Sequence, residues 1–113
     1  MEQPNVLELT RRLGREPNVD TALHIMMWNL GDLSKSWTYS KWHTDIEQDK
    51  AYLAEARHAL GSLLFQAEVV ARLLGTTSKD SFNFGVMTVE DRIEDKEKKR
   101  GRFQSYVGDK LSG

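Results

Sequence analysis

Polar and small side chains recur at helical spacing in the middle of the chain, in a pattern that suits metal and phosphate chemistry. Glu55, Ala59, Ser62 and Gln66 follow one another at intervals of four, three and four residues, so they form one stripe on a helix. Carboxylates on two facing helices could supply the oxygen ligands of Mg²⁺, and a bound Mg²⁺ neutralises phosphate oxygens and polarises an attacking water. The stripe therefore points to metal-assisted phosphate chemistry, although Ala59 and Ser62 bring no carboxylate to it.

A second cluster is the charged run EDKEKKRGR, residues 94–102. Arg presents a bidentate fork to phosphate oxygens, so Lys96, Arg100 and Arg102 are candidate phosphate ligands. The same run also suits a solvated helix face with ion pairs four residues apart, such as Glu94 with Lys98. Both interpretations stay open at this point.

Several single side chains also allow two interpretations. Trp28 and Trp42 either stack on a nucleobase or pack in a core or a dimer interface, and we favour packing for Trp37. Glu68 lies among apolar residues, so burial would raise its pKa. The alternative for Glu68 is a surface position or a pairing with Arg72, four residues later.

Helices must position these side chains. Both prolines, Pro4 and Pro17, lie near the start, and the rest of the chain is rich in helix-forming residues. Caps and glycines predict helices from Asn5 to about Leu13, from Asn18 or Asp20 to Trp37, from Thr44 or Asp45 to Gly75, and from Thr88 to Gly101. The segments predicted to be irregular are TYSKWHT (38–44), TTSKDSFNFG (76–85) and the tail 102–113.

Apolar lines at spacings of three and four predict the buried faces. The line on the second helix is Val19, Leu23, Met26, Leu30, Leu33 and Trp37. The line on the third is Leu53, Ala56, Leu60, Leu63, Ala67, Val70 and Leu74, widened by Ala59, Phe65, Val69 and Leu73. A helix that is apolar on more than one side is central to a bundle or lies at a dimer interface. The expected fold is all-α.

Composition excludes several classes of function. The 113 residues suit one domain spanning 1–113, and a net charge of −1 argues against a nucleic acid polymer or a membrane surface as partner. The chain has no cysteine, so disulfides and thiol nucleophiles are excluded. No apolar run approaches the ~20 residues needed to span a bilayer, and no signal peptide is recognisable. The expected location is cytoplasmic.

Three segments together resemble the MazG-like nucleoside triphosphate pyrophosphohydrolases, an all-α superfamily. WNLGDLSKS (28–36) is similar to the family pattern E-V-G-E-L, and HALGSLLFQAEVVARLLGTT (58–77) to E-L-x-D-V-L-F-Q. KEKKRGRF (96–103) is similar to K-N-x-x-R-G-x-F. The resemblance covers roughly residues 20–103 and implies a helical bundle of about four helices, completed by association into a homodimer or tetramer.

The resemblance also implies where a site would lie. Asn29 and Asp32 take the acidic positions of the first pattern, and Ala59 and Ser62 take those of the second. Only Asp32 remains acidic, so most of the family's charge for Mg²⁺ is missing. Glu55 and His58 are the residues that could replace lost metal ligands. In the third pattern Lys96 and Arg100 are retained, which favours them as phosphate contacts.

Three functions follow from this pattern. The favoured one is a diverged MazG-like protein that binds a nucleotide or related phosphate ligand with little or no hydrolysis, and no catalytic residue is assigned. The first alternative is an active Mg²⁺-dependent pyrophosphohydrolase that releases pyrophosphate from a nucleoside triphosphate. The second is a non-catalytic interaction protein. Both ligand-binding functions predict that Lys96 and Arg100 face the cleft near Asp32.

Overall fold

The fold is all-α. A computed structural model describes the backbone of residues 5–42 and 45–112 and the side chains of residues 5–42 and 45–101. Over these residues the chain forms four helices and no strand. The helices are α1 (Val6–Arg12), α2 (Val19–Trp42), α3 (Ile46–Leu73) and α4 (Ser78–Ser112).

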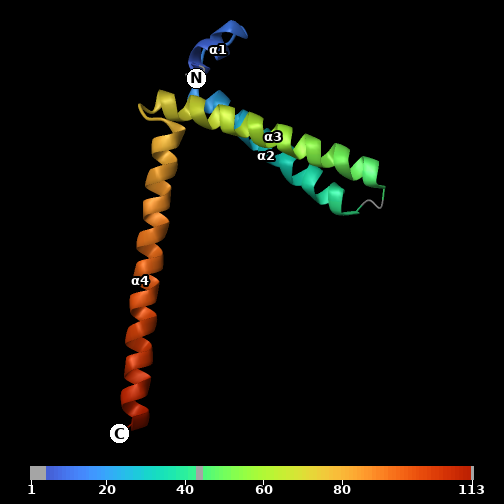
Figure 1. The fold of residues 1–113 in the computed structure, drawn as a ribbon. Coiled ribbons are helices and arrows are strands. Elements are labelled where there is room, and N and C mark those ends of the chain that lie inside the picture. The colour runs from blue at the N-terminus through green and yellow to red at the C-terminus, as the bar shows by residue number, and fades with distance from the viewer. Residues whose placement is uncertain (1–4, 43–44, 113) are drawn as a thin grey trace. The chain divides into compact units, whose positions relative to one another are not determined.

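The chain divides into two compact units, Met1–Ser78 and Lys79–Gly113. The first unit holds α1, α2 and α3, and Figure 1 shows α2 and α3 lying side by side along most of their length. A short connection joins them, so they pack as an antiparallel pair. The second unit is the single helix α4, which by itself has no core.

Side-chain caps and glycines set the ends of α1 and α3, as the sequence predicts. The side chain of Asn5 accepts hydrogen bonds from the backbone N–H groups of Leu7 and Glu8, and that of Asp45 accepts one from Glu47. Gly14 and Gly75 follow α1 and α3 with φ of +89° and +83°. This left-handed conformation is cheap only for glycine, and it lets the backbone fold back and bond the last carbonyls of each helix.

Three segments predicted to be irregular differ in the structure. α2 continues through 38–42, where no glycine or proline stands and the Ser40 hydroxyl bonds the Trp37 carbonyl within the helix. Residues 43–44 lie outside the described residues. α4 begins at Ser78 instead of Thr88 and continues through 102–112. Most of segment 76–85 and most of the tail are therefore helical. Gly101 costs a helix only about 1 kcal/mol relative to Ala, which a 35-residue helix without proline tolerates.

A small core joins the three helices of the first unit. Val69 of α3 is 1% exposed and clusters with Val6 of α1 and Ala22 of α2. The buried hydrophobic residues of the described chain are Val6, Ala22, Ala56, Ala59, Val69 and Ala71. Because most of these are alanines, the α2 and α3 backbones approach closely but bury little apolar surface per residue.

The predicted apolar line of α2 is only partly buried. Met26 and Leu33 are half-buried, whereas Leu23, Leu30 and Trp37 are 43%, 57% and 50% exposed. The polar Ser36 is buried in their place, against α3. The helix therefore turns a mixed face of small and polar residues toward α3, and its large apolar residues lie beside that face.

Glu68 of α3 binds the backbone at Ser78, the residue at which α4 begins. Its carboxylate is buried and accepts hydrogen bonds from Arg72 Nε at 2.6 Å and from the Ser78 backbone N–H at 2.8 Å. The Ser78 side chain bonds it as well, and these bonds outweigh burial and hold the pKa of Glu68 below its ordinary value. The predicted pairing with Arg72 is confirmed, and the pKa is lowered where burial alone would raise it.

No single helix among the described residues is long and apolar enough to cross a membrane. α3 and residues 78–101 of α4 meet that criterion only when they are counted together, and then on length and composition alone.

Candidate functional site

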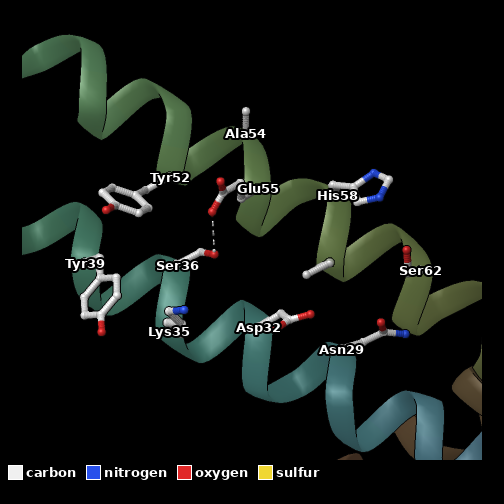
Figure 2. Close-up of a pocket in the computed structure, with 11 residues that line it drawn as sticks. Asn29, Asp32, Lys35, Ser36, Tyr39, Tyr52, Ala54, Glu55, His58 and Ser62 are labelled. Atoms are coloured by element: carbon white, nitrogen blue, oxygen red, sulfur yellow. Dashed lines mark hydrogen bonds between the residues drawn. The ribbon is translucent and has the colours of Figure 1, made fainter.

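A polar pocket lies between α2 and α3. Its volume is about 540 Å³, and every residue that lines it belongs to one of these two helices. Figure 2 shows side chains from both helices around it. The lining residues are Asn29, Asp32, Lys35, Ser36, Tyr39, Tyr52, Ala54, Glu55, His58, Ala59 and Ser62.

Helical spacing explains the contribution of α2. Asn29, Asp32, Ser36 and Tyr39 follow one another at intervals of three, four and three residues, so they lie on one face. Asn29 and Ser36 are partly or fully buried, whereas Asp32 is exposed at the rim. Lys35, three residues after Asp32, is also exposed and brings a positive charge to the same rim.

α3 presents the matching face from the opposite side. Tyr52, Glu55, Ala59 and Ser62 recur at intervals of three, four and three residues. Ala59 is buried, and because its side chain is a methyl group the space a longer side chain would fill remains part of the pocket. The Ser36 hydroxyl donates to Glu55 Oε2 at 3.4 Å, which links the two helices across the pocket (Figure 2).

The amide of Asn29 is the least satisfied polar group in the pocket. Its Nδ2 is buried and has no hydrogen-bond partner among the described residues. A buried donor without an acceptor costs about 1–3 kcal/mol. Asn29 lines the pocket, but its Nδ2 is itself buried and presents almost no surface to a ligand there.

Aromatic rings form the other end of the pocket. Tyr39 and Tyr52 meet edge to face with ring centroids 5.7 Å apart, and the Lys35 ammonium lies 5.7 Å from the Tyr39 ring. The Trp42 ring also lies against Tyr39, with the two ring centroids 6.1 Å apart. Trp42 therefore touches a wall of the pocket without lining it.

The predicted metal ligands share the pocket but not a coordination sphere. Asn29, Asp32, Glu55 and His58 all line it. Over the described part of the chain, however, no three His, Asp or Glu side chains lie close enough together to hold a metal ion. Mg²⁺ is usually held by one or two carboxylates, with waters and substrate phosphates as its other ligands. Asp32 and Glu55 are the two carboxylates that line the pocket, and their binding of Mg²⁺ stays a prediction.

Several lining residues were missed by sequence reasoning. Lys35, Ser36, Tyr39 and Tyr52 received no role, although all four line the pocket. The signal was present: extending the stripe of Asn29 and Asp32 by helical spacing reaches Ser36 and Tyr39, and extending that of Glu55 backward reaches Tyr52.

Other predicted site residues lie outside the pocket. Trp28 is 71% exposed on α2 and does not line it. Lys96 and Arg100 are exposed on α4, in the second unit. Their predicted approach to Asp32 therefore stays a prediction. The predicted ion pair on that helix is confirmed, with Lys98 Nζ 3.1 Å from Glu94 Oε1.

No model of a protein family, no characterised protein sequence and no solved structure matches the chain. The membership of the MazG-like superfamily, predicted from three short segments, therefore stays a prediction.

Proposed function

We propose that the pocket between α2 and α3 binds a nucleotide or another phosphate-bearing small molecule, in a diverged MazG-like protein with little or no hydrolytic activity. One observation carries the proposal. Asn29, Asp32, Ala59 and Ser62, the four positions that the resemblance assigns to the family's metal ligands, line the same pocket. Two segments that are about 30 residues apart contribute them, and helical spacing alone does not require such a meeting.

The lining suits a phosphate-bearing ligand. The Lys35 ammonium and the Ser62 hydroxyl are donors for phosphate oxygens. Asp32 and Glu55 supply acceptors for sugar hydroxyls or base N–H groups. A volume of about 540 Å³ falls within the ~300–1,000 Å³ typical of small-molecule sites.

The proposal favours binding over hydrolysis because hydrolysis needs a held metal ion. Ala59 offers no ligand atom, and Asn29 and Ser62 offer only neutral oxygens. Asp32 and Glu55 are the carboxylates that remain in the pocket, so we expect it to hold a divalent ion more weakly than four acidic positions would.

The second part of the proposal is self-association, with a second copy of the chain covering an apolar face. Leu23, Leu30 and Trp37 of α2 are exposed, as are Leu60 and Leu64 of α3. By helical spacing they lie away from the pocket on the two paired helices. Two packed helices bury only one interface, so further apolar surface is stabilised by a second layer.

Binding is tested by titrating ATP and inorganic pyrophosphate against intrinsic Trp fluorescence, because Trp42 contacts a pocket wall. We expect a saturable change, with an affinity about fivefold weaker in Lys35→Ala, since Lys35 is exposed and a charge pair in contact with solvent is worth about 1 kcal/mol or less. Lys50→Ala is the matched control, because Lys50 is exposed on α3 and does not line the pocket. Equal affinities in the two variants would exclude this pocket as the site.

Hydrolysis is tested on the same proteins by pyrophosphate release from a panel of nucleoside triphosphates with Mg²⁺ or Mn²⁺. We expect none. Release that Asp32→Ala abolishes and Asp91→Ala preserves would overturn the non-hydrolytic part of the proposal and support the pyrophosphohydrolase alternative.

A further inference from the structure

α4 carries an unpartnered apolar line. Phe82, Val86, Val89 and Ile93 follow one another at intervals of four, three and four residues, and they are 71%, 38%, 52% and 51% exposed. Phe82, Val86 and Val89 share a groove on one side of the helix, bordered by Gly85 and Glu90. Phe84 and Met87 are exposed as well but lie off this line.

The spacing is that of a coiled coil. Intervals that alternate between three and four average 3.5 residues, which keeps one seam facing a partner helix over many turns. In the sequence the same alternation continues through Lys96, Arg100, Phe103 and Val107. The spacing therefore continues over more than three heptads within the bounds of α4, with apolar residues at six of the eight positions and the cations Lys96 and Arg100 at the other two.

The charges that flank the seam have opposite signs on its two sides. With Val86, Ile93 and Arg100 at the a positions, Glu90 and Glu97 take the e positions. Arg92 and Lys99 take the g positions on the other side. All four are exposed, and no ion pair within the described residues joins Arg92 or Glu97 to another side chain.

We propose that α4 pairs in parallel with α4 of a second copy of this chain, forming a two-stranded coiled coil. In a parallel pair each g residue faces the e residue five positions further along the partner helix. Arg92 then meets Glu97 of the partner subunit, and the two-fold symmetry repeats the pair. An antiparallel pair would instead place e against e and g against g, bringing Glu beside Glu and Arg or Lys beside cations.

Lys96 and Arg100 occupy seam positions between two apolar stretches. A basic layer inside a coiled coil lowers stability but fixes the alignment of the two helices, because any shift would place these cations against apolar residues. Glu97 follows Lys96 directly, so the partner's Glu97 lies beside this layer and offsets part of its charge. Lys96 and Arg100 can therefore interrupt the apolar seam without ending the coiled-coil spacing.

The pairing is tested by disulfide trapping in the full chain, which contains no cysteine of its own. In a parallel pair Val89 faces its own copy, so we expect Val89→Cys to form a covalent dimer under mild oxidation. Asp91→Cys is the control, because Asp91 lies on the outer face of the same turns. Equal trapping of the two variants, or a monomer for both, would overturn the proposal.

Charge exchange provides a second measurement that does not depend on cysteine. Arg92→Glu and Glu97→Arg each place like charges across the parallel pair, so each variant alone should dimerise about tenfold more weakly. A mixture of the two variants restores both attractive pairs and should form mixed dimers, measured by sedimentation and by affinity capture of a tagged copy. If a tagged variant captures untagged copies of the same variant as well as it captures the other variant, the parallel alignment is excluded. If neither substitution changes the dimerisation affinity, the coiled coil is not what holds the dimer together. The dimer interface would then be the exposed apolar face of α2 and α3.

Discussion

Val69→Asp is expected to unfold the first unit. Val69 is 1% exposed and packs in a cluster with Val6 and Ala22, against Phe65 and Val70. All of these neighbours are apolar, so none can accept or pair a buried carboxylate. An unpaired buried charge is among the few changes that destabilise a small domain by about 4 kcal/mol or more. Because this cluster holds α1, α2 and α3 together, its loss should remove the packing of all three.

Circular dichroism and urea unfolding measure this effect. We expect the helical signal of Val69→Asp to fall toward that of α4 alone, and Val69→Ala to lose about 2 kcal/mol through the two missing methyl groups and the resulting cavity. Ala51→Asp is the control, since Ala51 is exposed on the same helix and a surface change costs about 0.5 kcal/mol or less. A Val69→Asp protein as stable as Ala51→Asp would show that this cluster does not hold the unit together.

Glu68→Gln is expected to destabilise the chain by about 2 kcal/mol at neutral pH. The carboxylate accepts from the Ser78 backbone N–H, the Ser78 side chain and Arg72. A glutamine amide keeps the shape but removes the charge, and its NH₂ group faces these donors. Hydrogen bonds to a charged, buried group are worth about 1.5–3 kcal/mol. The Arg72 side chain is 43% exposed, so solvent screening reduces its share, and the bonds to Ser78 carry most of the effect.

The pH dependence of this effect has a definite sign. The pKa of Glu68 in the folded protein is lowered from 4.5, first by the Ser78 side-chain hydrogen bond. The unfolded chain therefore binds the proton more tightly. The carboxylate stabilises the folded state fully only at a pH above 4.5, the ordinary pKa of the group. As the pH falls through the lower folded-state pKa, this stabilisation is lost.

Urea unfolding at neutral, mildly acidic and strongly acidic pH measures it. The difference in the free energy of unfolding between wild type and Glu68→Gln should be constant above pH 4.5 and should shrink at lower pH. Glu94→Gln is the matched control, because Glu94 also pairs with a cation four residues later but both side chains are more than half exposed. A difference for Glu68→Gln that does not change with pH would show that packing, and not the charge, is what the substitution removes.

The sequence predicts the local features of this fold well. Asn5 and Asp45 cap helices as expected, and Gly14 and Gly75 follow helix ends, because capping and left-handed conformations depend on a few neighbouring residues. Predicted loops were less accurate. Segment 76–85, predicted to be irregular, is helical from Ser78. Glu68 accepts a hydrogen bond from the Ser78 backbone N–H and so satisfies a donor in the first turn of α4. That acceptor is ten residues away in sequence, beyond any local window.

The candidate site shows the same division. Helical spacing alone puts Asn29 with Asp32, and Glu55 with Ser62, on single faces. Which face of α2 meets which face of α3 depends on packing, and the preference for close contact through Ala22, Ala56 and Ala59 turned Leu30 and Trp37 outward. Tyr39 and Tyr52 lie on the same helical faces as Asp32 and Glu55, so longer stripes would have included them, whereas the place of Lys35 in the pocket depends on the packing of the two helices.

By itself the sequence determined the all-α class, the caps at Asn5 and Asp45 and the glycines that follow the first and third helices, because these depend on chemistry within a few residues along one chain. Only the tertiary structure decided that Ser36 and Glu55 meet across two helices, that Glu68 is buried with a lowered pKa, and that the Nδ2 of Asn29 is buried without a partner among the described residues. Burial and pairing depend on residues distant in sequence, and the free-energy differences between alternative helix faces are small compared with the total energy of packing.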